Sequence, residues 1–408
     1  MGSTITLLML IFSTCKLKLP SVKMALDVYF KHRTVLRLLG ISLPGECGKA
    51  AKFWFAGVFL TLSLLFPTLV LCFLLGAMFY TEYSFTSRIY SITGVISCTS
   101  AFFKLQILFW NRKNIKNLMD ATNGYKADTP TGKLTYRLTI LYELLTLTYR
   151  SFSVIEILIK RPKKLVMPFW TPFVVPDTPS ASVSMLIFFQ TSMMLKTLSN
   201  FPVDTLFLHI TNQICHKLYI LKNTMELLGH IGEERKGKLE INNVLSVQGE
   251  VDDEKLLKTC IQEFNTILGH IQILSKMLDE FFVPLAFNSF TSLLFAFFLV
   301  SQSDDMVKEG FKIAPWTSVI FAQIYIACWA GELIKKRCGD IHFAAYNNAW
   351  YNTNLSVRKS LALVQTFTVK PVVLRGAYVF ELSLHTYETV VREVFSSFTV
   401  LYQLFNQK

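Results

Sequence analysis

The stretch WFAGVFLTLSLLFPTLVLCFLLGAMF, residues Trp54 to Phe79, contains no charged residue. About 20 mostly apolar residues in a helix are enough to cross a bilayer, so this stretch predicts a transmembrane helix. The composition agrees, because 52% of the 408 residues are apolar, 17% are charged, and the mean hydropathy is +0.40. Soluble domains carry about 25% charged residues, and the chain is therefore expected to be a membrane protein.

Six further runs have the length of a membrane span. Two of them, residues 281–300 and 314–333, carry at most one charge. The other four are more polar and lie at residues 89–110, 134–159, 182–210 and 382–404. Charges inside these runs, such as Lys104 and Asp204, are costly in lipid and should face protein or water. The sequence thus predicts an all-α membrane protein with seven transmembrane helices around a polar interior.

The basic residues give the orientation of these helices. The net charge is +13, and Lys and Arg gather before the first span and in the loops at 111–133, 211–280 and 334–381. Because basic loops stay in the cytosol, the N-terminus is expected to be cytosolic and, after seven spans, the C-terminus extracellular. The basic residues thus lie in loops at the membrane surface and form no compact basic domain. We therefore expect membrane lipid, and no nucleic acid, as a partner.

The loop between the fourth and fifth spans contains a second pattern. After Asp252 and Asp253, apolar residues recur at helical spacing as far as Phe281. This predicts an amphipathic helix that runs directly into the fifth span. The helix packs either on its own chain alone or also on neighbouring subunits in a cytosolic bundle, which the amphipathic stretch Leu355 to Val369 could join.

These patterns divide the chain into six expected segments. They are a cytosolic segment (1–53), transmembrane helices 1–4 with a cytosolic extension (54–228), a mobile cytosolic linker (229–252), a cytosolic helix with transmembrane helices 5 and 6 (253–340), a cytosolic anchor helix (341–381) and transmembrane helix 7 (382–408).

The last span has a polar stripe that indicates a pore. Ser396, Val400, Gln403 and Leu404 fall near one helical face, together with Glu393 and other polar residues. Several copies of this helix around an axis would line a pore, in which Val400 and Leu404 form an apolar constriction that gates by dewetting. The alternative is a helix whose polar side is buried within its own subunit.

No sequence motif points to an enzyme. The chain lacks H-E-x-x-H, P-loop, G-x-G-x-x-G and G-x-S-x-G patterns, and no two of its seven histidines are three or four residues apart. We therefore expect no catalytic residue, no metal site and no cofactor.

The C-terminal third resembles the insect odorant receptors. The stretches that carry the resemblance are Gly331-Glu332-Leu333, Ala345-Tyr346-Asn347-Asn348-Ala349-Trp350-Tyr351, Lys370-Pro371 with Gly376, Leu382-Ser383-Leu384 with Tyr387, and Ser396-Ser397-Phe398-Thr399-Val400-Leu401. Ser397 departs from the family pattern, in which an aromatic residue is usual. The outer stretch Pro168-Phe169-Trp170-Thr171-Pro172-Phe173 is similar to the family's loop after the third span.

The resemblance implies an odorant-gated, non-selective cation channel in the plasma membrane of olfactory neuron cilia. Such channels are tetramers with one central pore, lined by the last helix and held by a cytosolic anchor of helices. The chain lacks the long insertion of the olfactory co-receptor between spans four and five, so it resembles a tuning subunit that assembles with that co-receptor.

The resemblance also places the site for a small volatile odorant in the outer half of the bundle. The candidates are Tyr90, Thr93, Gly94, Tyr149, Phe152, Ser153, Met185, Phe188, Phe189, Ser192, Thr317, Ile320 and Phe321. Aromatic and Met side chains with a few hydroxyls suit a mostly apolar ligand, although simple helix packing would use the same residue types.

Two other classes of receptor remain open at this point. A gustatory receptor of the same channel superfamily would end in a T-Y and Q-F pattern, where this chain has Ser396-Ser397 and Gln403-Leu404. A metabotropic, G-protein-coupled seven-helix receptor would have the opposite orientation and an Asp-Arg-Tyr sequence after the third span, which is absent.

Overall fold

The computed structural model of the chain describes residues 29–45, 57, 75–76, 85–122, 130–159, 204–230, 252–303 and 305–406. Most of the expected first span, residues 182–203 of the fourth span and most of the linker expected at 229–252 lie outside the described residues. Within the described ranges the long elements are all helices, and the only strands form one short antiparallel pair. The predicted all-α class is confirmed.

Helix α10 (Asp253–Ser301) is a single helix of 49 residues. The Asp252 carboxylate caps its N-terminus by accepting a hydrogen bond from the Glu254 backbone N–H (3.5 Å), and Asp253 and Glu254 place negative charge where the helix dipole favours it. At about 1.5 Å per residue the helix is about 74 Å long, more than twice the hydrocarbon thickness of a bilayer. The prediction that the amphipathic helix continues into the fifth span is confirmed.

Helix α11 (Met306–Ala344) contains the sixth predicted span and extends beyond both of its ends. Asp305 starts the helix, because its side chain accepts a hydrogen bond from the Lys308 backbone N–H (3.0 Å). The helix continues past residue 340, where the sequence had suggested a segment boundary, and ends at Ala344.

The remaining helices of the bundle are α5 (Phe85–Trp110), α7 (Pro130–Ile159) and a helix at residues 204–225. Among the described residues three helices, α5, α10 and α11, are long and apolar enough to cross a membrane. Shorter helices, α2 (Phe30–Leu38) and α6 (Arg112–Thr122), pack beneath the bundle, where Arg33 and Asp120 form an ion pair of 2.7 Å.

The chain reaches its last helix through a compact connection. After α11 come the one-turn helix η3 (Trp350–Asn352), α12 (Leu355–Thr368) and the strands β1 (Arg375–Gly376) and β2 (Phe380–Glu381), in which Arg375 pairs with Glu381. Glu381 also accepts a hydrogen bond from the Lys335 ammonium (2.7 Å), which raises the pKa of that lysine. The last helix is α13 (Leu384–Asn406), which contains most of the seventh predicted span.

Two glycines allow this connection to lie close to the bundle. A Cβ on Gly331 in α11 would lie 2.0 Å from the Leu382 carbonyl oxygen, and one on Gly376 would lie 2.7 Å from the Phe282 ring. Real Cβ atoms do not approach so closely, so glycine is required at both positions for the segment before α13 to contact α10 and α11.

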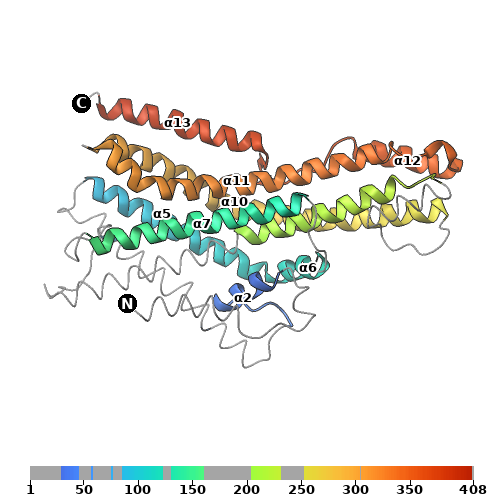
Figure 1. Cartoon of the computed structure of the whole chain (residues 1–408), viewed down its shortest axis with the longest axis horizontal. Coiled ribbons are helices and arrows are strands. Elements are labelled where there is room, and N and C mark those ends of the chain that lie inside the picture. Colours follow the sequence, from blue (N-terminus) through green and yellow to red (C-terminus); the bar gives the residue numbers. More distant parts are fainter. Residues whose placement is uncertain are drawn as a thin grey trace.

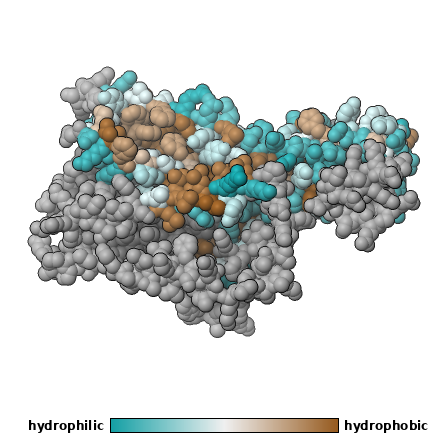
Figure 2. Space-filling model, in the orientation of Figure 1, coloured by the Kyte–Doolittle hydropathy of each residue, from teal (hydrophilic) through white to brown (hydrophobic). Residues whose placement is uncertain are grey.

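The helices form an elongated bundle in which α10 and α11 run side by side along the long axis (Figure 1). Helices α5 and α7 lie beside one half of this pair, α12 lies at the opposite end, and α13 runs along the outside (Figure 1). Among the described residues, hydrophobic patches gather in the half that contains α13, and the end at α12 is mostly hydrophilic (Figure 2). We call the half that contains α5, α7 and α13 the membrane half. A hydrophobic half and a hydrophilic end are what the sequence predicts for transmembrane helices with a cytosolic extension.

Candidate functional site

A buried ion pair joins helices of the membrane half. The Lys104 ammonium on α5 lies 3.2 Å from Asp204 Oδ1, with the two side chains 2% and 4% exposed. The other carboxylate oxygen, Oδ2, accepts hydrogen bonds from the Tyr142 hydroxyl on α7 (3.1 Å) and the Gln323 amide on α11 (2.5 Å). The Lys104 ammonium also lies 5.0 Å from the centre of the Phe281 ring on α10. We call Lys104, Tyr142, Asp204 and Gln323 the Asp204 network.

The Asp204 carboxylate is surrounded by an ammonium and by hydrogen-bond donors, which offset the cost of burying it away from water. A charge deep in a membrane protein is paired with an opposite charge and with polar groups, because its desolvation is costly. Each oxygen of the Asp204 carboxylate has at least one donor, and the donors come from three different helices. The network therefore ties α5, α7, α11 and the helix at 204–225 together in one place.

A second polar contact joins α5 and α11 nearer their outer ends. The Tyr90 hydroxyl donates a short hydrogen bond to the Glu309 carboxylate, which is also paired with the Lys312 ammonium at 3.1 Å. The same ammonium lies 5.0 Å from the centre of the Tyr90 ring. We call Tyr90, Glu309 and Lys312 the outer bridge.

The two polar contacts lie on the same faces of their helices. On α5, Lys104 lies within about 20° of Thr93 and about 40° of Tyr90 around the helix at 3.6 residues per turn. The same spacing holds on α11 for Lys312 and Gln323. The main packing partner of α5 is α10, and α11 packs on α10 and α7. Besides the two polar contacts, α5 and α11 share a buried apolar cluster that contains Ile89 and Ile313.

The structure places some of the expected ligand-binding residues on these faces. Tyr90 belongs to the outer bridge, Thr93 is buried and its hydroxyl donates to the Tyr90 carbonyl oxygen (2.9 Å), and Gly94 is buried beside it. Tyr149 is half-buried on the face of α7 that also holds Tyr142. These residues come from two helices that lie beside the same half of the bundle (Figure 1).

The structure does not bring the α11 candidates to this face. Ile320 is 4% exposed and packs against Leu293 of α10 and Val394 of α13, and Phe321 lies against the same cluster. The Thr317 hydroxyl donates to the carbonyl oxygen of Ala314 in its own helix (3.0 Å). These three residues point toward α10, α13 or the surface of α11 rather than toward Tyr90.

Six further candidates have no described side chain. Phe152 and Ser153 belong to α7, but their side-chain surroundings lie outside the described part of the structure. Met185, Phe188, Phe189 and Ser192 lie in the undescribed part of the fourth span. Their place in a ligand site stays a prediction.

Sequence reasoning missed several residues that the structure brings together. Lys104 and Asp204 were expected to face protein, yet their separation of 100 positions gave no sign that they pair. The sixth span was expected to begin only at residue 314, whereas α11 already begins at Met306 and so includes Glu309 and Lys312. Asp305 followed by Glu309 is a helix-start signal that could have revealed them.

Helix α13 turns one face to its own bundle and one face away from it. Val394 is fully buried against α10 and α11, and Phe395 stacks on Phe297 of α10 at 5.0 Å although it is 48% exposed. Ser396, Val400 and Gln403 are exposed, Val400 at 55%. The Leu404 side chain lies outside the described residues. The stripe expected to be polar is thus not buried within its own subunit over its described part.

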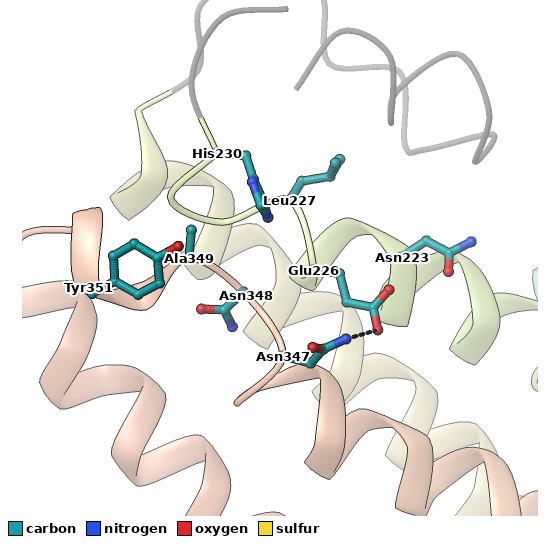
Figure 3. Close-up of a pocket in the computed structure, with 8 residues that line it drawn as sticks. All are labelled: Asn223, Glu226, Leu227, His230, Asn347, Asn348, Ala349 and Tyr351. Atoms are coloured by element: carbon teal, nitrogen blue, oxygen red, sulfur yellow. Dashed lines mark hydrogen bonds between the residues drawn. The ribbon is translucent and has the colours of Figure 1, made fainter. Parts of the chain in front are cut away.

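A polar pocket of about 250 Å³ lies at the opposite end, near η3. Its walls come from the end of the 204–225 helix and from the segment after α11 (Figure 3). The lining residues are Asn223, Glu226, Leu227, His230, Asn347, Asn348, Ala349 and Tyr351. The Asn347 amide donates to the Glu226 carboxylate (3.4 Å), and the Ala349 N–H donates to the Leu228 carbonyl oxygen (3.0 Å). These bonds hold the two wall segments together.

Comparison with known proteins now identifies the class of protein. The family described as 7tm Odorant receptor matches residues 84–395, and the chain belongs to this family of transmembrane receptors. The resemblance found in the C-terminal third is therefore confirmed over most of the chain.

Individual relatives are distant in sequence. Odorant receptor Or2 of Anopheles gambiae is 24% identical over 151 residues, which cover 37% of this chain and 39% of that receptor. Odorant receptor 23a of Drosophila melanogaster is 22% identical over 245 residues, or 58% of this chain and 59% of that receptor. The matches thus span between two fifths and three fifths of these relatives.

Solved structures show the fold at full length. The insect olfactory receptor OR5 from Machilis hrabei superposes with a TM-score of 0.74 at 14% identity, covering 92% of this chain and 97% of that one. The structure of the same receptor in complex with eugenol gives a TM-score of 0.71 at 15% identity with the same coverage. The seven-helix fold predicted from hydropathy is confirmed by this likeness.

Proposed function

We propose that the chain is the tuning subunit of an odorant-gated, non-selective cation channel, assembled as a heterotetramer with the olfactory co-receptor. The observation that carries this proposal is the exposed stripe of α13. Ser396, Val400 and Gln403 face away from their own bundle, although the helix is long enough to span a bilayer. A half-polar stripe is unfavourable against lipid and favourable around a water-filled axis shared by several subunits.

The ligand in this proposal is a small volatile odorant that lies between α5, α7 and α11. Tyr90, Thr93 and Tyr149 line this region, and the outer bridge and the Asp204 network lie at its two ends. One insect receptor with the same fold binds eugenol, a small aromatic molecule, which supports a ligand of similar size.

Coupling between ligand and pore runs through α11. Its Gln323 face belongs to the Asp204 network, whereas Ile320 and Ile324 on another face contact Val394 of α13. A ligand that binds better to one arrangement of α5 and α11 shifts the population of channels toward that arrangement, and α13 moves with it. We place this channel in the plasma membrane, in the dendritic cilia of olfactory neurons.

The test is whole-cell current during application of an odorant panel, in cells with G-protein signalling blocked. Cells that express the chain with the co-receptor are compared with cells that express either subunit alone. The proposal expects ligand-dependent cation current that needs both subunits and keeps the ligand selectivity of the chain. A response that disappears when G-protein signalling is blocked would contradict it.

A further inference from the structure

The Asp204 network lies directly inward of the residues that line the proposed odorant site. Tyr142 lies about 10 Å inward of Tyr149 along α7, and Lys104 about 16 Å inward of Thr93 along α5, at 1.5 Å per residue. Both pairs lie on one face of their helix to within about 20°. A molecule that enters between α5, α7 and α11 from the outer side therefore meets the Asp204 network at its inner end.

The network also links α5 to α11, and both of these helices pack on α10. Away from the network, the outer bridge connects α5 and α11, and a buried apolar cluster contains Ile89 of α5 and Ile313 of α11. At the inner end Gln323 reaches across from α11 to the carboxylate of Asp204, which Lys104 holds from α5. All four side chains of the network are buried, Lys104 and Asp204 almost fully.

We infer that the Asp204 network is the floor of the odorant site and that Gln323 sets the length of ligand that the site accepts. This inference rests on the proposed function, because it concerns the same site. A hydrocarbon chain cannot displace a carboxylate that is paired with an ammonium, since the separated charges would lose their partners in an apolar environment. The floor is therefore fixed, and a ligand too long for the space above it is excluded.

Of the four side chains in the network, Gln323 can be shortened with the smallest loss of stability. Asp204 keeps its ion pair with Lys104 and its hydrogen bond from Tyr142 when the Gln323 amide is removed. The volume that Gln323 leaves lies between α11 and the carboxylate. Extra methylenes of a ligand can occupy it, and each buried methylene improves binding by about fourfold.

The experiment measures half-maximal concentrations for straight-chain primary alcohols and aldehydes from butyl to decyl, on cells that express the chain with the co-receptor. The Gln323→Ala variant is expected to shift the preferred length by one or two carbons, with about a fourfold gain for each methylene relative to the native chain. Gln323→Asn keeps the amide and is shorter by one methylene, so it should shift the preference in the same direction by less. Ser318→Ala, at an exposed position of α11, is the control and keeps the native preference.

The outcomes separate this inference from the proposed function. Gln323→Ala channels that reach the surface and respond with the native length preference overturn the inference alone. If Gln323→Ala does not reach the surface, the same result with Gln323→Asn overturns it. A native channel that responds to the odorant panel but is silent to the whole series overturns the inference and leaves the proposed function standing, because no chain length is then selected. A Tyr142→Phe variant should keep the native length preference, because the phenyl ring preserves the shape of the floor and only a hydrogen bond is lost. A changed preference in this variant would overturn the inference.

Discussion

The Tyr90 hydroxyl on α5 donates a hydrogen bond to the Glu309 carboxylate on α11, across 219 positions of the sequence. Lys312 completes the contact from the next turn of α11, with its ammonium near both the carboxylate and the Tyr90 ring. Hydrogen bonds to charged groups contribute about 1.5–3 kcal/mol when they are shielded from water. This contact fixes the separation of α5 and α11 on the outer side of the proposed odorant site.

Removal of the Tyr90 hydroxyl should lower ligand potency. Tyr90→Phe keeps the ring and the Glu309–Lys312 ion pair but loses the bond between the two helices, so the site is less well organised before the ligand binds. We expect the half-maximal concentration to rise about threefold to tenfold, which corresponds to part of one hydrogen bond. Dose–response curves normalised to surface expression measure this effect, with Ser318→Ala as the control on α11. An unchanged curve for Tyr90→Phe would remove the outer bridge from the site.

Breaking the Lys104–Asp204 pair should destabilise the whole bundle. Lys104→Met leaves the Asp204 carboxylate buried without its countercharge, and the loss of one partner of such a pair costs about 3–5 kcal/mol. The double variant Lys104→Met with Asp204→Leu removes both charges and should recover much of the stability. The midpoint of thermal unfolding of the detergent-solubilised protein measures both.

A comparison pair on the same bundle provides the control for this prediction. Arg337 and Asp340 form an ion pair of 3.1 Å within α11, with side chains 22% and 28% exposed. Partly exposed pairs of this kind contribute about 0–1 kcal/mol, so Asp340→Asn should change the unfolding midpoint little. Equal losses for Lys104→Met and Asp340→Asn would show that the buried pair has no special role in stability.

Substitution of Gly331 should prevent correct packing of α13. A Cβ at this position would lie 2.0 Å from the Leu382 carbonyl oxygen, whereas a Cβ on Gly339 in the same helix meets no atom within 4 Å. Overpacking costs about 1–3 kcal/mol, and alanine at an open helical position gains about 0.5–1 kcal/mol over glycine. Gly331→Ala should therefore reduce the amount of receptor at the cell surface, and Gly339→Ala should preserve or increase it. The opposite order would contradict the close contact between α11 and the segment before α13.

Two buried cysteines, Cys260 of α10 and Cys338 of α11, should be unreactive at neutral pH. Burial raises the pKa of the Cys260 and Cys338 thiols to about 12, and only the thiolate is a nucleophile. Maleimide labelling followed by mass spectrometry should leave both unmodified in the native protein and modify both after denaturation. A cysteine introduced at Leu363, which is 62% exposed on α12, should react readily in the native protein. Native-state labelling of Cys260 and Cys338 at the rate of Leu363→Cys would show that these helices do not pack as described.

Hydropathy and amphipathic spacing predicted much of the fold. The continuous α10 and the positions of α5, α11 and α13 follow from apolar runs and their polar ends, because these patterns are local in sequence. The contacts of the candidate site are not local. Lys104 and Asp204 are brought together by the rotation of two helices about their axes, and a single sequence carries little information on that rotation.

The α11 candidates illustrate the same limit. Thr317, Ile320 and Phe321 were chosen from the family's general arrangement, and the rotation of α11 about its axis decides whether such residues face α5 or α13. The structure turns Ile320 toward Val394, and it is Lys312 that reaches Tyr90 of α5 and Gln323 that reaches Asp204. The extension of α11 to Met306 by the Asp305 cap then brings Glu309 into the bundle.

Modification of cysteines introduced along α13 tests most directly whether this helix lines an odorant-gated pore. Ser396→Cys and Val400→Cys are expressed with the co-receptor, and a charged methanethiosulfonate reagent is applied while an odorant holds the channel open. The account predicts an irreversible fall in current for both variants, faster with odorant than without, and no change for Val394→Cys, whose position is fully buried within the subunit. Odorant currents that are insensitive to the reagent at both Ser396 and Val400 would contradict the account.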